Sequence, residues 1–361
     1  MKERVYAFDL PRYLGRSTKA TSESVRRIVI KPTNRCVANC VACASRRSVY
    51  GSIRPDELVS IEQWQRLFDD LKKTKLESIT ISGGEPTLYP QLADLIMMAK
   101  QCGWHVALNT NGWRLKSGSS FHRLVTSGVD CITISVDSST AQLHDELRQL
   151  QGLWESAVTG LTKLMYYNSD TESPIQVNVR SILSRYNYTD LPRLVGMCMR
   201  FRVDALMISY IEADFVNGHF LLTKEQIADL KQNVIPQVIS YFMCYAPAKG
   251  TIKEDAIRKL QTIFPEEASS LEEYSRGIYW GDEEAIETYC TIPYEFALVT
   301  PKGDVYPCNA IEYFGEPTMG NIKEESFLDI WFSSAFNLFR MDKCEWCRYC
   351  PMNLHTVIPL K

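Results

Sequence analysis

Residues 27–43 read RIVIKPTNRCVANCVAC, and the fold can be worked out from this stretch. It begins with an apolar, β-branched run, Arg27–Lys31, which is typical of a buried strand. Cys36, Cys40 and Cys43 then follow within eight residues. A strand that leads directly into three thiols predicts a metal site on the loop at the end of that strand.

Similar apolar runs recur up to residue 210 and alternate with amphipathic runs of helical spacing. The predicted strands are Arg27–Lys31, Glu77–Ile81, His105–Asn109, Cys131–Val136, Ile175–Leu183 and Ala205–Tyr210. The predicted helices are Ser60–Lys73, Gln91–Gln101, Ser120–Ser127, Leu153–Tyr167 and Tyr188–Arg200. Such alternation predicts an α/β fold with a parallel sheet and right-handed crossovers. Six repeats favour an open, partial (β/α)6 TIM-like barrel over residues 26–210.

The remaining sequence divides into three further parts. Residues 1–25 form an N-terminal extension. Residues 211–287 form a helical linker region with predicted helices at Lys224–Tyr245, Lys253–Ile263 and Glu267–Glu273. Residues 288–361 form a C-terminal extension with Gly- and Pro-containing strand and turn signals, a helix near Ser326–Phe339 and a second group of cysteines.

Composition limits the partners and the compartment. The net charge is −3, from 40 basic and 43 acidic residues, so we expect binding neither to nucleic acid nor to an anionic membrane. The N-terminus lacks the apolar core of a signal peptide, and we expect a cytoplasmic protein. Twelve cysteines in such a protein are not expected to form a disulfide framework. Cys102, Cys131, Cys198 and Cys244 are scattered and fit small buried hydrophobic residues.

Three thiolates on one short loop suit an iron–sulfur cubane that keeps one iron open for a small chelating ligand. Two alternatives remain open for Cys36, Cys40 and Cys43. Zinc usually takes four closed ligands, and no histidine or fourth cysteine lies nearby in the sequence. Chance clustering is the other alternative, because one motif alone does not exclude it.

Further motifs stand at the ends of the next three strands, where β/α barrels place their active sites. Ser82–Pro86 reads SGGEP, Asn109–Gly112 reads NTNG, Ser135–Asp137 reads SVD and His144–Arg148 reads HDELR. In this order, with the first three cysteines, they resemble the radical S-adenosylmethionine (SAM) superfamily.

The resemblance implies a [4Fe–4S] cluster on Cys36, Cys40 and Cys43 and a SAM molecule bound at the strand ends. It implies that Gly84 and Glu85, within Gly83–Pro86, hold the amino group of SAM. It further implies a contact of Ser135 and Asp137 with the ribose and a pairing of Arg148 with the SAM carboxylate. Asn109 and Asn111 also belong to the implied SAM site. Ala42 departs from the family pattern, which often has an aromatic residue before the third cysteine, so the adenine contact is left unassigned.

The second group of cysteines has its own spacing. Cys290 is followed by twelve residues, Gly303, four residues and Cys308, and the group ends with Cys344, Cys347 and Cys350. This pattern resembles the SPASM/Twitch extension and implies an auxiliary [4Fe–4S] cluster. Because a fully ligated cubane takes about four thiolates, five cysteines predict one cluster with one cysteine to spare. The sequence does not say which of the last three is spare, and zinc remains the alternative.

The implied activity is that of a radical SAM oxidoreductase. SAM is cleaved reductively to a 5′-deoxyadenosyl radical that takes hydrogen from a substrate carbon, with flavodoxin or ferredoxin as an electron donor. We expect oxidation of a small polyol, amino sugar or nucleoside, because only about 30 residues precede the first strand and a peptide leader-binding domain is not evident. The first alternative is a maturase that crosslinks or epimerises a ribosomal peptide. The second is a non-enzymatic iron–sulfur or zinc scaffold, which would have no need of a SAM site.

Overall fold

The structure is a computed structural model, and it describes most of the chain. The described residues are 24–43, 57–210, 219–245, 251–261, 290, 292–309, 311–313, 318–341 and 356–360. The predicted helix Glu267–Glu273 and the cysteines Cys344, Cys347 and Cys350 lie outside these residues, as does nearly all of the N-terminal extension.

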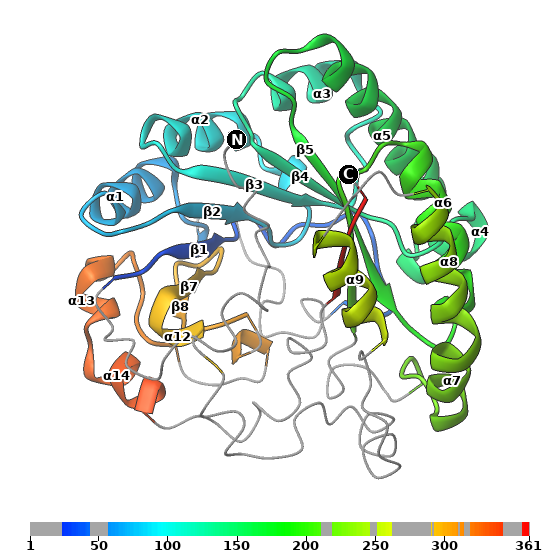
Figure 1. Cartoon of the computed structure of the whole chain (residues 1–361). Helices are drawn as coiled ribbons and strands as arrows, with labels where there is room; N and C mark the ends of the chain where they lie inside the picture. The colour runs from blue at the N-terminus through cyan, green and yellow to red at the C-terminus, as the bar shows by residue number, and fades with distance from the viewer. Residues whose placement is uncertain are drawn as a thin grey trace.

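One curved sheet of nine strands organises the described residues, in the order β8-β7-β1-β2-β3-β4-β5-β6-β9 (Figure 1). The strands are β1 (Arg27–Ile30), β2 (Ser78–Ile81), β3 (His105–Thr110), β4 (Cys131–Ser135), β5 (Gln176–Leu183), β6 (Ala205–Tyr210), β7 (Phe296–Val299), β8 (Val305–Tyr306) and β9 (Thr356–Pro359). Strands β7 and β1 to β6 are parallel neighbours, and the two edge strands are antiparallel. The six predicted strands and the partial barrel are therefore confirmed.

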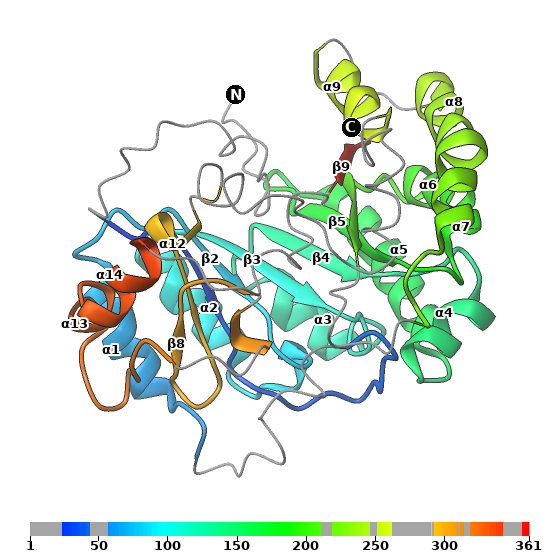
Figure 2. The same cartoon turned by 90° about the horizontal axis from the view of Figure 1, so that it is seen from below.

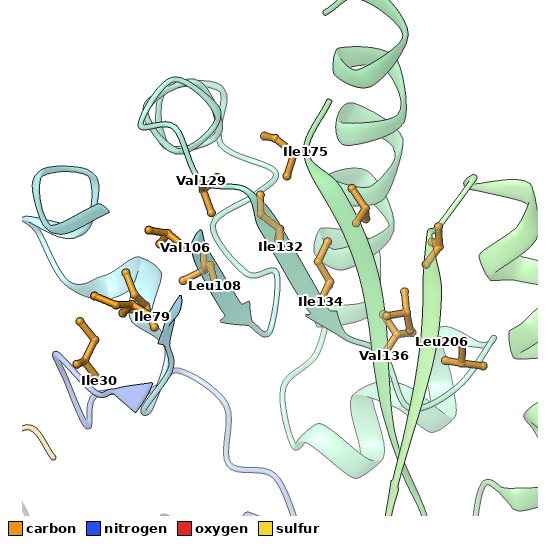
Figure 3. Close-up of a cluster of buried hydrophobic side chains, with 14 of the residues drawn as sticks. Ile30, Ile79, Val106, Leu108, Val129, Ile132, Ile134, Val136, Ile175 and Leu206 are labelled. Carbon is orange, nitrogen blue, oxygen red and sulfur yellow. The ribbon is translucent and has the colours of Figure 1, made fainter. Parts of the chain in front are cut away.

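The two faces of the sheet have different chemistry. The face beneath the helices carries aliphatic side chains such as Ile30, Ile79 and Leu108, all fully buried (Figure 3). Because side chains alternate along a strand, the residues between them face the inside of the barrel. Polar residues of this inner face include Thr80, Asn109, Thr133, Ser135, Asn178, Arg180 and Ser209. A TIM-barrel interior packed with branched aliphatic residues would be solid, whereas this inner face offers hydrogen-bonding groups.

Helices cover the outer side of the sheet (Figure 1). The helices of the barrel are α1 (Ile61–Leu71), α2 (Leu92–Gln101), α3 (Gly118–Val125), α4 (Ala141–Arg148), α5 (Leu153–Asp170) and α6 (Leu191–Arg200). The first begins as its sequence predicts, because the Ser60 hydroxyl accepts a hydrogen bond from Gln63 N–H and the Gln63 side chain accepts one from Ser60 N–H. Helix α4 was not predicted, although residues of the HDELR motif lie on it.

The C-terminal part of the chain extends both edges of the barrel sheet, which the sequence did not indicate. Strand β7 pairs in parallel with β1, with Phe296 level with Arg27, and β9 pairs with β6. Residues 296–306 and 356–359, within the segment predicted as the auxiliary-cluster domain, thus belong to the same sheet as the barrel.

The other helices cover opposite ends of the sheet (Figure 2). They are α7 (Lys224–Asp229), α8 (Ile235–Tyr245) and α9 (Thr251–Gln261) in the linker region, and α12 (Ile292–Glu295), α13 (Phe327–Trp331) and α14 (Ser334–Met341) near the C-terminus. A π-helical turn, η7 (Leu230–Val234), joins α7 to α8. Helix α8 packs on α6, and α13 packs on α1, where Phe327 N–H donates to Asp70. Among the described residues, no helix has the length and apolar character needed to cross a membrane.

Candidate active site

The loop that follows β1 carries Cys36, Cys40 and Cys43 at the carboxyl edge of the parallel strands. Cys36 is exposed, and the other two are partly buried. Cys43 N–H donates to the Cys40 carbonyl at 3.3 Å, which folds the end of the loop into a turn. Two anchors hold the rest of this cysteine loop, one beside Cys36 and one beside Cys40.

The Cys36 anchor is the turn after β2. Gly84 N–H donates to the Thr33 carbonyl at 3.0 Å, and Glu85 N–H donates to the Arg35 carbonyl at 2.7 Å. Gly83 has a positive φ of 124°, and a Cβ atom on Gly84 would stand 2.3 Å from the Arg35 carbonyl oxygen. Both glycines are therefore needed for the turn to lie against the backbone of the cysteine loop.

Glu85 ties this turn to the end of β3. Its buried carboxylate accepts hydrogen bonds from the backbone and hydroxyl of Thr87 at 3.1 and 2.6 Å, from the Thr110 hydroxyl at 2.6 Å and from Asn111 N–H at 2.7 Å. Burial raises the pKa of Glu85, and these four donors oppose the rise. The Asn111 amide in turn points at the cysteine loop, with its Nδ2 3.7 Å from Cys36 Sγ.

The Cys40 anchor is the C-terminal end of α4. The Arg148 carbonyl accepts from Asn39 N–H at 3.1 Å, and the Leu147 carbonyl accepts from Val41 N–H at 3.0 Å. The loop therefore satisfies carbonyls that a helix end leaves without intrahelical partners. Between these two contacts, Arg148 Nη1 lies 3.8 Å from Cys40 Sγ. Burial raises the pKa of the Cys40 thiol, and the Arg148 guanidinium opposes this rise.

Asp137 holds the Arg148 guanidinium in place. Its Oδ2 accepts from Arg148 Nε at 2.5 Å, and its Oδ1 accepts from Ile182 N–H at 2.9 Å. Asp137 N–H donates to His144 Nδ1 at 3.1 Å, and the Asp137 carbonyl accepts from the Asn187 amide at 2.8 Å. Burial and the Arg148 charge lower the pKa of His144 to about 4, so its ring stays neutral and can accept that hydrogen bond at pH 7.

The other predicted SAM-site residues are less tightly enclosed. Asn109 and Ser135 are partly buried on the inner face, and Ser135 is level with Arg180 of β5. Pro86 is buried and opens a single 3₁₀ turn, η4 (Pro86–Leu88). The structure thus brings the predicted residues Gly84, Glu85 and Asn111 together at one anchor, and Asp137 and Arg148 at the other. Their roles toward SAM remain predictions.

Cys290 and Cys308 lie toward the opposite edge of the sheet. Cys290 precedes β7, whose first residue Phe296 is level with the first residue of β1, and Cys308 follows β8, which runs antiparallel to β7. Both cysteines are partly buried.

A buried ion pair joins the two cysteine-bearing segments. Lys31, the residue before the cysteine loop, contacts Glu312 on the 3₁₀ turn η8 (Ile311–Tyr313), four residues after Cys308. Lys31 is 5% exposed and Glu312 is 3% exposed. Sequence inspection missed this pair because its members are 281 residues apart. The sequence assigned no role to Thr110 and His144, although both lie in the quoted motifs, nor to Asn187. Thr110 acts on the site through the Glu85 carboxylate, and His144 and Asn187 act through the backbone of Asp137.

The cysteine loop meets the chemical requirements of a multi-iron cluster. Partial desolvation raises the pKa of Cys36 to about 11, and nearby Glu85, Cys40 and Cys43 add to the rise. Because the pKa values of the Cys36 and Cys40 thiols are both raised, their thiolates are favoured when a metal cation binds to them. Side-chain N–H groups already point at two of the sulfurs. Within the described ranges, no three His, Cys, Asp or Glu side chains form a group that could hold a single metal ion.

Two protein-family models match this chain. The radical SAM superfamily model matches residues 30–174, which hold the cysteine loop, the Gly83–Pro86 turn and α4. The SPASM model, described as an iron–sulfur cluster-binding domain, matches residues 290–351, which hold all five C-terminal cysteines of the second group.

Relatives and solved structures agree with these matches. A PqqA peptide cyclase from Ruegeria pomeroyi is 22% identical, over 94% of this chain and 83% of its own length. An AdoMet-dependent heme synthase from Methanosarcina barkeri is 23% identical, over 91% of this chain and 90% of its own length. Streptococcus suis SuiB bound to SAM superposes with a TM-score of 0.63 at 18% identity, covering 91% of this chain and 72% of SuiB. SuiB bound to its precursor peptide SuiA gives 0.62 at 17% identity, covering 92% and 71%.

Proposed function

Since this chain belongs to the radical SAM superfamily and carries a SPASM-type C-terminal domain, we propose that it modifies a peptide substrate. As a radical SAM enzyme it uses a [4Fe–4S] cluster and SAM, and its SPASM domain implies auxiliary iron–sulfur binding. When bound, the cluster supplies the electron that splits SAM, giving the 5′-deoxyadenosyl radical that removes hydrogen from a substrate carbon.

The residues of the two anchors support this assignment. We propose that Cys36, Cys40 and Cys43 hold the SAM-binding cluster. N–H groups of Asn111 and Arg148 can stabilise the negative charge of two of the ligand sulfurs, and Cys36 is accessible. The Gly83–Pro86 turn and the ends of β3 and β4 are proposed to bind SAM. The Glu85 carboxylate already accepts four hydrogen bonds, so a SAM ammonium group at this position would share an oxygen with Thr87, Thr110 or Asn111.

For the auxiliary cluster we propose Cys290, Cys308 and two of Cys344, Cys347 and Cys350, which lie outside the described residues. A Cys290→Ala/Cys308→Ala variant is then expected to lose about four irons per chain, by the ligand count of one cubane. It should keep some SAM cleavage. Iron content equal to that of the wild type would contradict this ligand set.

A peptide is the substrate class that the relatives favour over a small polyol, amino sugar or nucleoside. The PqqA relative is a peptide cyclase that aligns over 94% of this chain, and this similarity carries the proposal. The polar inner face adds support, since its partly buried polar side chains, such as Asn109 and Arg180, can bond to a peptide backbone. The relatives are named as a cyclase and a synthase, so the classification of this enzyme as an oxidoreductase stays a prediction.

Deuterium transfer tests the substrate class without knowledge of the substrate. The anaerobically reconstituted enzyme, SAM and dithionite are incubated with a perdeuterated extract of the source organism, and 5′-deoxyadenosine is analysed by mass spectrometry. We expect deuterium in 5′-deoxyadenosine, and we expect protease treatment of the extract to remove the transfer. The Cys36→Ala/Cys40→Ala/Cys43→Ala variant is the background control.

Transfer that survives protease treatment and passes with the low-molecular-mass fraction would contradict a peptide substrate. Separation of that fraction would then distinguish tetrapyrroles, in keeping with the heme synthase relative, from polyols and nucleosides.

A further inference from the structure

Two sulfurs of the cysteine loop receive side-chain N–H groups of different charge. At Cys36 the donor is the neutral amide of Asn111, at 3.7 Å. At Cys40 the donor is the guanidinium of Arg148, at 3.8 Å, and this guanidinium also donates to Asp137. Cys40 therefore lies beside a buried cation and its counterion, whereas Cys36 has a neutral donor and lies near the buried Glu85 carboxylate.

The position of Arg148 relative to Cys40 is fixed from several directions. Backbone hydrogen bonds on both sides of Cys40, from Asn39 and Val41, end on the carbonyls of Arg148 and Leu147. The guanidinium is held by Asp137, which is itself held by Ile182 N–H and His144 Nδ1. Arg148 is 9% exposed and Asp137 is 6% exposed, so water screens their charges weakly.

We propose that Arg148, positioned by Asp137, sets the reduction potential of the cluster on Cys36, Cys40 and Cys43 through its N–H contact with the Cys40 sulfur. The inference rests on the proposed ligand role of these cysteines, and it does not depend on the substrate. One-electron reduction adds a negative charge to the cluster and its thiolates. A buried cation that donates to a ligand sulfur stabilises the reduced form and raises the potential. The Asp137 carboxylate, which pairs with the guanidinium, reduces this effect.

This role differs from pairing with the SAM carboxylate, which the family resemblance implies for Arg148. A residue that serves only SAM leaves the potential of the SAM-free cluster unchanged. A residue that tunes the cluster changes that potential before SAM is added. The two roles are therefore separated by a measurement on the SAM-free protein.

The test is an anaerobic redox titration of the reconstituted full chain, without SAM, followed by electron paramagnetic resonance. The signal of the first cluster is the one missing from the Cys36→Ala/Cys40→Ala/Cys43→Ala variant. Arg148→Gln is expected to lower the ratio of reduced to oxidised cluster about tenfold at a fixed potential, which for one electron equals about 59 mV. Asp137→Asn is expected to shift the ratio the other way, because it leaves the guanidinium charge uncompensated.

Two further variants complete the set. Arg148→Lys keeps the positive charge but replaces the planar guanidinium, which donates to Asp137 and Cys40 together, with a single ammonium group. We therefore expect a shift in reduction potential smaller than that of Arg148→Gln. Arg123→Gln removes an exposed arginine of α3 and should leave the potential unchanged. If Arg148→Gln assembles no cluster, the other two variants still test the proposal. Arg148→Lys should lower the reduction potential, and Asp137→Asn should raise it.

An unchanged SAM-free potential in Arg148→Gln, with weaker SAM binding, would overturn the proposal. Shifts of the same sign in Arg148→Gln and Asp137→Asn would also overturn it, because they would indicate a general disturbance of the loop. A wild-type chain that binds no iron on the cysteine loop would instead refute the proposed ligand role itself, which the iron analysis reports separately.

Discussion

The two anchors of the cysteine loop are built by different means. The Cys36 anchor depends on close backbone approach: Gly84 lies so near the loop that a Cβ atom would stand 2.3 Å from the Arg35 carbonyl oxygen. The Cys40 anchor depends on charge: Arg148 contacts Cys40 and is held by Asp137. We infer that the first anchor fixes where the loop lies, and that the second fixes the electrostatic environment of its sulfurs.

The cysteine loop leaves β1 at Lys31, whose buried ammonium pairs with Glu312, and we expect the largest effect from breaking this pair. Glu312→Gln removes the carboxylate partner of the buried Lys31 ammonium. Breaking a buried pair in this way costs about 3–5 kcal/mol of unfolding free energy. The variant should show a lower urea midpoint and reduced iron binding.

The double variant Lys31→Met/Glu312→Leu is the matched control for this pair. It removes both charges together, and we expect it to recover part of the lost stability. If Glu312→Gln and the wild type unfold at the same urea midpoint, the pair does not hold the two segments together.

A smaller effect is expected from Gly84→Ala, which tests the Cys36 anchor alone. The new methyl group would meet the carbonyl oxygens of Arg35 and Asn34, so the turn and the loop must separate. We expect a loss of about 1–3 kcal/mol in unfolding free energy, as for overpacking elsewhere, and fewer irons per chain. Gly118→Ala on α3, where no atom lies within 4 Å of the new Cβ, is the control. Equal iron content in the two variants would rule out a positioning role for Gly84.

The smallest effect at neutral pH is expected from His144, which supports the Cys40 anchor. Its pKa is lowered to about 4 in the folded chain, against 6.5 as its ordinary value, so the unfolded chain takes up a proton first as the pH falls. Stability from this group is therefore present above about pH 6.5 and is lost toward pH 4, at about 1.4 kcal/mol per pH unit. His144→Asn removes the titration and should flatten the urea midpoint between pH 6.5 and pH 4.5. A slope equal to that of the wild type would exclude His144 as its source.

Sequence patterns revealed the Cys36 anchor more fully than the Cys40 anchor. The Gly83-Gly84 pair and Asn111 belong to short motifs at strand ends, where the parallel-sheet prediction already places them on one edge. The Cys40 anchor uses main-chain carbonyls of α4, a helix of eight residues that the sequence did not indicate. Every residue has a main-chain carbonyl, so a contact made by one cannot be recognised from the sequence.

Long-range pairings explain the other differences. The sequence of β7 predicts an apolar run but not that it lies beside β1, because β pairing depends on tertiary packing. The Lys31–Glu312 pair likewise depends on the fold that brings its members together. The preference for a small substrate rested on the short segment before β1, whereas the PqqA peptide cyclase relative, aligned over 94% of this chain, favours a peptide.

The central claim is that Cys36, Cys40 and Cys43 hold the cluster that cleaves SAM. The most direct measurement is the release of 5′-deoxyadenosine by the anaerobically reconstituted protein with SAM and dithionite, determined by liquid chromatography. We predict release by the wild type and by Cys102→Ala, a matched cysteine variant at the end of α2, and none by the Cys36→Ala/Cys40→Ala/Cys43→Ala variant. Release that persists in the triple variant would contradict the account.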